Sequence, residues 1–138
     1  GGDEGLIDQK RGGDNWKLGL WQGYWGEDFV AVLELTDGEK PSRLGANFIQ
    51  DQKSWIFLPV EVAYYVSDNG KDYKLLEIVK NDMPERNEEI LQKVFYTSKP
   101  INHRFVKVVA KNIKTNPSWH LSAGEKSWLF TDELIIEF

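Results

Sequence analysis

The sequence lacks cysteine and long apolar runs. With no cysteine among its 138 residues, disulfide bonds, thiolate zinc sites and cysteine nucleophiles are excluded. No apolar stretch approaches the roughly 18 residues of a membrane-spanning helix, and no charged start followed by a short apolar stretch marks a signal peptide. We therefore expect no membrane insertion, and any targeting segment would lie outside these residues.

Positive charge is also scarce. Lys and Arg number 17 against 22 Asp and Glu, which gives a net charge of −5, and no basic block occurs. Because binding along a phosphate backbone requires concentrated positive charge, we expect no nucleic-acid partner. The length matches one globular domain. We expect residues 1–5, rich in glycine, to be a linker or a remnant of cloning, and residues 6–138 to form the domain.

Alternation of apolar and polar residues predicts β-strands at short intervals. The odd positions of residues 29–35 and the even positions of residues 60–66 are apolar, which is typical of half-buried strands. Between strands, Ser67-Asp68-Asn69-Gly70 predicts a hairpin turn, because Asn-Gly favours positive φ. Further strands are expected at 44–49, 73–79, 91–95, 105–110 and 134–138.

Helical periodicity is limited to a single turn expected over residues 84–91. Neither an internal repeat nor a low-complexity segment is present, which disfavours propellers and solenoids. The sequence therefore predicts an all-β fold, most simply an antiparallel sandwich of about seven or eight strands.

The six tryptophans are many for a chain of this length. Trp55 and Trp119 fall in polar loops, where a tryptophan either plugs the end of the core or offers a flat apolar face to a ligand. Both alternatives stay open, with ligand contact favoured for Trp119. Trp128 lies in an apolar run and is expected in the core. A glycine-rich segment without alternation, predicted to be a structured loop, holds Trp16, Trp21 and Trp25.

Aromatic rings and polar loops together favour a sugar as ligand. One face of a pyranose presents only C–H groups, which pack on aromatic rings, while its rim hydroxyls need carboxylate, amide, guanidinium or imidazole partners. For each Asp or Asn the alternative is turn formation or capping. The candidate sugar contacts are Trp119, His120, Trp55, Asp51, Gln50, Asp14, Asn15 and Arg86.

Five short motifs occur in the order found in a known family. They are Leu6-Ile7-Asp8 with Asp14-Asn15-Trp16, Val30–Leu35, Val66–Gly70, Arg104–Val108 and Asp132–Leu134. In these motifs the chain resembles the coagulation factor 5/8 type C domain, or discoidin domain, which includes the family 32 carbohydrate-binding modules. It departs from the family pattern at Glu34, where aspartate is usual, and at Gln9, where glycine is usual. Nothing pairs a basic run with an exposed apolar spike, the mark of lipid-binding members.

The loops around residues 11–23, 50–55 and 116–120 resemble those of C-terminal modules on bacterial family 20 β-N-acetylhexosaminidases, or chitobiases. This resemblance implies an antiparallel eight-stranded jelly-roll β-sandwich, galactose-binding-domain-like, with a sugar site in the loops at one end. It also implies a secreted, periplasmic or cell-surface bacterial parent enzyme.

One structural Ca²⁺ is a further implication of the resemblance. Asp8 and Glu133 match the family's ligand positions, and Asp14 would add a third oxygen ligand. The alternative is that Gln9 marks a loop that has lost the ion.

The expected function is that of a non-catalytic carbohydrate-binding module. It would tether a glycoside hydrolase to glycans bearing galactose or N-acetylhexosamine, and we expect a monomer. The alternative is a structural accessory domain that packs on the catalytic domain of the parent enzyme and binds no sugar. Hydrolysis by the chain itself would need two carboxylates roughly 5 to 10 Å apart, whereas Glu88-Glu89 fits a solvated charge run and Asp132-Glu133 straddles two faces of a strand.

Overall fold

The computed structural model describes residues 10–12, 15–18, 22–35, 38–83, 86 and 89–138. Almost all of the regular structure in these ranges is β. No helix among them has the length and apolar character needed to cross a membrane. The strands are β1 Lys10–Gly12, β2 Asn15–Leu18, β3 Gln22–Trp25, β4 Phe29–Glu34, β5 Arg43–Gln50, β6 Glu61–Ser67, β7 Lys74–Lys80, β8 Leu91–Tyr96, β9 Phe105–Ala110 and β10 Trp128–Glu137.

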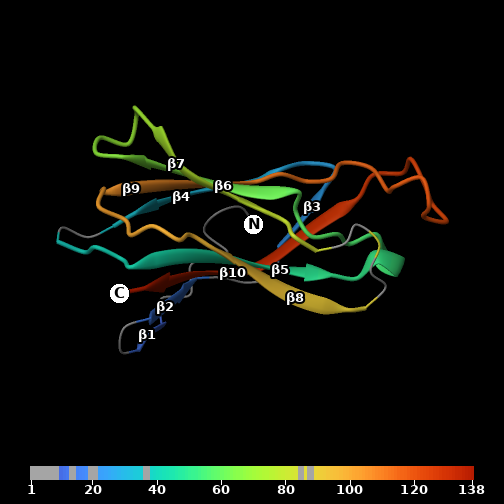
Figure 1. Ribbon diagram of the computed structural model, residues 1–138, viewed down its shortest axis with the longest axis horizontal. Helices are drawn as coiled ribbons and strands as arrows, with labels where there is room; N and C mark the ends of the chain where they lie inside the picture. The colour runs from blue at the N-terminus through green and yellow to red at the C-terminus, as the bar shows by residue number, and fades with distance from the viewer. Residues whose placement is uncertain (1–9, 13–14, 19–21, 36–37, 84–85, 87–88) are drawn as a thin grey trace.

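The strands form two antiparallel sheets that stack as the layers of a β-sandwich (Figure 1). One sheet has the order β1-β2-β10-β5-β8, with β3 also paired to β10. The other sheet has the order β4-β9-β6-β7. Strands β2 and β3 share one edge of β10, where β3 pairs with residues 128–131 and β2 with residues 134–137. The long strand β10 is thereby hydrogen-bonded on both edges.

The alternating pattern is confirmed in the strands where it was clearest. In β4, Phe29 and Ala31 are buried while Val30 and Val32 are exposed. In β6, Val62, Tyr64 and Val66 are buried as the pattern predicts, and the small side chain of Ala63 on the other face is buried as well. The alternating side chains place one face of each strand on the core. The strands expected at 44–49, 73–79, 91–95 and 105–110 are found as β5, β7, β8 and β9, with small shifts at their ends.

Three expectations about the rest of the chain differ from the structure. The segment around Trp16 and Trp25 was predicted to be a loop, which is wrong, because β2 and β3 form there against β10. Trp128 is only half-buried, because it begins β10 beside exposed Trp25, and so the prediction that it belongs to the core is also wrong. The last strand begins at Trp128 rather than at Leu134.

Some expectations fall outside the described residues. The helical turn predicted over 84–91 includes residues 84, 85, 87 and 88, which the structure does not describe, and Leu91 already begins β8. Trp21 and residues 1–5 also lie outside the described ranges. The described strands number ten rather than the eight expected.

The hairpin turn predicted between β6 and β7 is confirmed. The Ser67 hydroxyl accepts hydrogen bonds from the backbone N–H groups of Asn69, at 3.2 Å, and Gly70, at 3.0 Å. Gly70 has φ of 75°, and a side chain there would also press on the ring of Phe105. The positive φ therefore favours glycine here, and a larger residue would also displace the Phe105 ring slightly.

Aromatic side chains join the two sheets across the core. Phe48 of β5 lies edge-on to Phe29 of β4, with ring centroids 6.3 Å apart, and edge-on to Phe95 of β8, at 5.7 Å. The buried Tyr64 of β6 donates its phenolic hydrogen to the backbone carbonyl of Phe95 in the opposite sheet. Burial, and secondarily the charge of Glu77, raises the pKa of Tyr64 far above its ordinary value of 10.0. The phenol is thus kept as a neutral donor between the sheets.

We predict that Tyr64→Phe lowers the free energy of unfolding by about 1–3 kcal/mol at neutral pH, because the buried carbonyl of Phe95 loses its side-chain donor. The folded state holds the phenol proton more tightly than the unfolded chain does. The contribution of Tyr64 is therefore complete below pH 10 and falls as the pH rises above 10. Urea unfolding of both proteins from pH 7 to 11 should show the difference narrowing above pH 10, and a constant difference would contradict this account.

Candidate ligand-binding site

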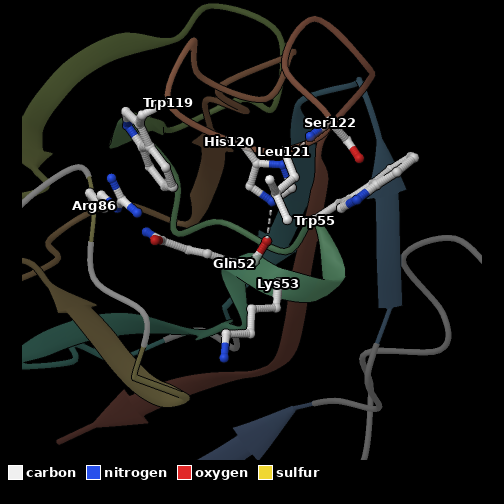
Figure 2. Close-up of a pocket in the computed structure, with 8 residues that line it drawn as sticks. All are labelled: Gln52, Lys53, Trp55, Arg86, Trp119, His120, Leu121 and Ser122. Carbon is white, nitrogen blue, oxygen red and sulfur yellow. Dashed lines mark hydrogen bonds between the residues drawn. The ribbon is translucent and has the colours of Figure 1, made fainter.

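A pocket of about 440 Å³ opens at one end of the sandwich (Figure 2). Three connections contribute to it: the segment after β5, the segment before β8 and the loop before β10, which meet at the same end of the molecule in Figure 1. The lining residues are Gln52, Lys53, Trp55, Arg86, Trp119, His120, Leu121 and Ser122.

The segment after β5 is a tight, closed turn. Asp51 and Ile56 exchange backbone hydrogen bonds of 2.9 and 3.0 Å, and a short 3₁₀ helix, η2 Gln52–Ser54, lies between them. Trp55 follows with φ of 66°, a left-handed conformation that is rare for a bulky residue. Its carbonyl accepts a 2.7 Å bond from the N–H of Trp128, which holds the turn on β10. Backbone strain of this kind persists where surrounding contacts fix the conformation, and it often marks functional sites.

The loop before β10 is held by one buried amide. Asn116 is 3% exposed, its Nδ2 donates to the carbonyl of Ser122 at 3.0 Å, and its Oδ1 accepts from the hydroxyl of Ser127 at 2.8 Å. The backbone N–H of Asn116 also donates to the carbonyl of Glu125 at 2.7 Å. A buried amide with partners on both sides fixes its loop, so Trp119 and His120 are presented from a defined position.

His120 connects the two loops through its ring. Its Nδ1 accepts the backbone N–H of Ser122 at 2.9 Å. Because Nδ1 is an acceptor, Nε2 carries the proton, and Nε2 lies 2.6 Å from the carbonyl oxygen of Gln52, to which it donates. Both ring nitrogens are therefore engaged by protein atoms, and His120 contributes its ring faces and the spacing of the loops to the pocket.

Trp119 is half-buried and forms one wall of the pocket (Figure 2). Its ring lies edge-on to Phe57 at 6.2 Å, and the guanidinium carbon of Arg86 is 5.1 Å from its centroid, within the range of a cation–π contact. Within the described structure, its indole N–H is buried and has no hydrogen-bond acceptor. The ring, rather than the N–H, is therefore the functional part of this side chain.

Four of the predicted sugar contacts meet in this pocket: Trp55, Trp119, His120 and Arg86. Gln50 is 2% exposed and donates from Nε2 to the carbonyl of Glu89 at 3.1 Å, so it holds the segment before β8. The carboxylate of Asp51 accepts the hydroxyl of Ser54 at 3.0 Å, which is the turn-forming alternative considered for it. Neither Gln50 nor Asp51 lines the pocket.

Asn15 lies in β2, opposite Glu137 at the far end of β10. Nine residues of strand separate Glu137 from Trp128, which at roughly 3.3 Å per residue places Asn15 about 30 Å from the pocket end of β10. Asp14 lies outside the described residues. The structure therefore does not bring Asn15 to the pocket.

Sequence reasoning missed four lining residues: Gln52, Lys53, Leu121 and Ser122. Gln52 and Leu121 adjoin a predicted residue and Lys53 and Ser122 lie two positions from one, and that proximity in the chain was the available signal. Leu121 is fully exposed. Its position on the surface depends on the tertiary closure of the loop.

The predicted calcium ligands cannot be placed together. Asp8 and Asp14 are outside the described ranges, as is the side chain of Glu133, whose backbone lies in β10 beside a register shift. Within the described part of the chain, no group of three or more His, Asp or Glu side chains could hold a metal ion. Calcium therefore stays a prediction.

Comparison with known proteins assigns no family. No protein-family model matches the chain, and no curated protein matches it. The discoidin resemblance is therefore supported by the sequence motifs alone.

We predict that His120→Phe lowers the free energy of unfolding by about 1–3 kcal/mol, because it keeps an aromatic ring but removes the bond to Gln52 that joins the loops and the bond to Ser122 within the loop before β10. Leu121→Ala is the neighbouring control and should change it by less than about 0.5 kcal/mol, since the side chain is fully exposed. Thermal and urea unfolding measure both. Equal effects of the two substitutions would show that the imidazole bonds do not hold the site.

Proposed function

We propose that the chain is a non-catalytic carbohydrate-binding module whose ligand occupies the pocket between Trp55 and Trp119. The observation that carries this proposal is the convergence of two tryptophans, from loops far apart in the chain, on one pocket (Figure 2). A rigid, half-exposed indole offers the flat apolar face on which the C–H side of a pyranose packs.

The dimensions of the pocket support the same proposal. A volume of about 440 Å³ falls within the roughly 300–1,000 Å³ of small-ligand sites. Two of the three connections that form it are held by hydrogen bonds of Asn116 and His120, which limits the ordering entropy lost on binding. A preformed, half-open site of this size suits one end of a glycan.

The residues that line the pocket favour sugar binding without hydrolysis. Glycoside hydrolysis requires a pair of carboxyl groups flanking the bond that breaks. None of the eight residues that line the pocket, all within the described ranges, carries a carboxylate.

The proposal also includes the topology and the parent enzyme that the discoidin resemblance implies. The sandwich would be a jelly roll of the galactose-binding type, and its parent a bacterial glycoside hydrolase, such as a β-N-acetylhexosaminidase, that is secreted, periplasmic or on the cell surface. A single shallow site binds weakly, and tethering to the parent enzyme raises the effective concentration of its substrate.

A second candidate function is that of an accessory domain that packs on a neighbouring domain. One observation favours it: exposed apolar side chains lie on the outer face of the sheet β4-β9-β6-β7. In the pairing register, Val30, Val109, Ala63 and Ile78 form one apolar row across all four strands, and Val30 and Ile78 at its ends are 42% and 41% exposed. The adjacent row holds Val32 and Leu75, 47% and 50% exposed, but it is interrupted by Lys107. Exposed apolar side chains grouped on one face are typical of an interface.

We predict that Trp119→Ala weakens glycan binding at least tenfold, which corresponds to about 1.4 kcal/mol, because the stacking face is lost. Trp119→Phe is the matched variant, since it keeps a flat ring and removes an N–H that has no partner. Its affinity for the glycan should lie within about threefold of that of the unsubstituted chain. Leu75→Ala on the outer sheet face is the distant control and should leave binding unchanged.

The measurement is a glycan array followed by calorimetric titration of the strongest hit, with thermal unfolding to show that each variant is folded. A folded chain that binds no glycan at millimolar ligand would contradict the binding function. It would shift the proposal to the accessory domain.

We also propose that Ca²⁺ bound by Asp8, Asp14 and Glu133 stabilises the chain. An ion that binds only the folded state raises stability by mass action. Exhaustive chelation should therefore lower the melting temperature by several degrees, and added Ca²⁺, but not Mg²⁺, should restore it. An unchanged melting temperature after chelation would show that no structural ion is present.

A further inference from the structure

We infer that the ligand of the pocket is a glycan chain of at least two sugar units, and that its further units lie on a row of three tryptophans: Trp55, Trp128 and Trp25. We call these three residues the tryptophan row. The inference rests on the proposed function, which places a glycan in the pocket. It adds a second binding surface on the outside of the six-stranded sheet, and it specifies the ligand as an oligosaccharide or a polysaccharide.

The three tryptophans of the row stand on neighbouring backbone segments. The N–H of Trp128 donates to the carbonyl of Trp55 at 2.7 Å, and across the other edge of β10, Trp128 pairs with Trp25 of β3. Neighbouring strands lie about 4.8 Å apart, so two such steps place the backbone of Trp25 about 10 Å from that of Trp55. Trp55 also lines the pocket, on the side opposite Trp119 in Figure 2. The row is therefore continuous with the pocket.

The side chains of Trp128 and Trp25 lie on the outer face of the six-stranded sheet. Leu129, the next residue of β10, is 1% exposed, and alternation along the strand turns Trp128 and Phe130 away from the core. Trp25 is directly opposite Trp128 in the pairing register, which places it on the same face, and it is 48% exposed. The outer face thus presents indole surface to solvent next to the pocket.

The rings on this face are ordered by their contacts. The ring centroids of Trp25 and Trp128 are 6.1 Å apart and the ring planes differ by 24°. Near-parallel rings at this separation are offset rather than superposed, so part of each ring face stays uncovered. Phe130 packs on Trp128 at 5.4 Å. The indole N–H of Trp25 donates to the carbonyl of Lys126 at 3.0 Å, which fixes the orientation of the ring and leaves its apolar surface for a ligand.

A linear glycan matches a row of rings. Each pyranose unit packs its C–H face on an aromatic ring, and its rim hydroxyls need hydrogen-bonding partners. The ammonium of Lys126 lies 5.1 Å from the centroid of the Trp25 ring, and the side chain is exposed. A cation–π contact at an exposed site is weak, so the ammonium is free to turn and donate to a hydroxyl of the sugar that stacks there.

The size of this surface favours a sugar chain over a protein partner. Two half-exposed indoles offer on the order of 200 Å² of apolar surface, whereas a stable protein interface buries about 800 Å² on each partner. An additional sugar unit needs only a ring to stack on and a few polar neighbours. Because the row begins inside the pocket, the same ligand reaches both surfaces.

The test measures how affinity depends on the length of the glycan. The whole chain is titrated by calorimetry with two series, chito-oligosaccharides and β-1,4-linked galacto-oligosaccharides, each from one to five units. In the series that binds, affinity should rise at least tenfold from the monosaccharide to the tetrasaccharide, which is more than the number of equivalent sugar units alone supplies. The gain reflects stacking of the added units on Trp128 and Trp25.

Two variants of Trp25 identify the source of this gain, and thermal unfolding shows that each is folded. Trp25→Leu keeps an apolar side chain but loses the flat ring, and it should reduce the length gain below threefold while affinity for the monosaccharide stays within twofold. Trp25→Phe keeps a flat ring and should retain a gain of at least fivefold. Leu75→Ala is the matched control, because Leu75 is an apolar residue of similar exposure, 50%, on the other sheet. It should leave the whole series unchanged.

The outcomes separate the inference from the function it rests on. A length gain that Trp25→Leu removes and Trp25→Phe retains supports the inference. Affinity that does not depend on length, a gain that Trp25→Leu leaves intact, or equal loss in both variants overturns it, while binding of the monosaccharide keeps the proposed function in place. The first two of these results would leave the Trp25 surface to a protein partner. Absence of binding by every member of both series, together with a blank glycan array, overturns both.

Discussion

Ser127, the residue before β10, and Trp128, its first residue, hold the two loops of the pocket. The Ser127 hydroxyl donates to the buried amide of Asn116, and the Trp128 N–H donates to the carbonyl of Trp55. Trp128 pairs with Trp25 of β3, and from Phe130 onward β10 also pairs with β5, so the start of β10 is fixed in the six-stranded sheet. The sheet therefore fixes where each loop begins or ends. The hydrogen bond from His120 to the carbonyl of Gln52 then sets the distance between the two loops.

The pocket and the outer face of the four-stranded sheet lie on different parts of the molecule, so both can be used at the same time. The pocket opens at one end of the sandwich, whereas exposed Val30 and Val32 lie on the outer face of the four-stranded sheet. A domain can therefore pack on a neighbour through the sheet face and still present Trp55 and Trp119 to a ligand. The buried bond from Tyr64 to the carbonyl of Phe95 joins the sheets between these two surfaces.

Local sequence determined the strands that could be predicted, and long-range pairing determined those that could not. Alternation in β4 and β6 reports burial of every second residue, which needs no knowledge of partners. Strands β2 and β3 lack alternation and form because residues more than a hundred positions later supply β10. The loops of Trp55 and Trp119 were identifiable from composition, but their meeting, and the engagement of both His120 nitrogens, depend on tertiary closure. Gln50 and Asp51 have polar side chains of the kind that bind sugar hydroxyls. In the structure, however, Gln50 donates to the carbonyl of Glu89 and Asp51 accepts from Ser54.

The most direct test of the account is a titration followed through the indole N–H signals of the six tryptophans by two-dimensional ¹⁵N–¹H NMR. A glycan that binds the chain on the array should shift the signals of Trp55 and Trp119, assigned from single tryptophan-to-phenylalanine variants, while the signal of a tryptophan outside the pocket, such as Trp16, stays in place. Shifts confined to tryptophans away from the pocket, or no shift of any signal at millimolar ligand, would contradict the claim that this pocket binds a glycan.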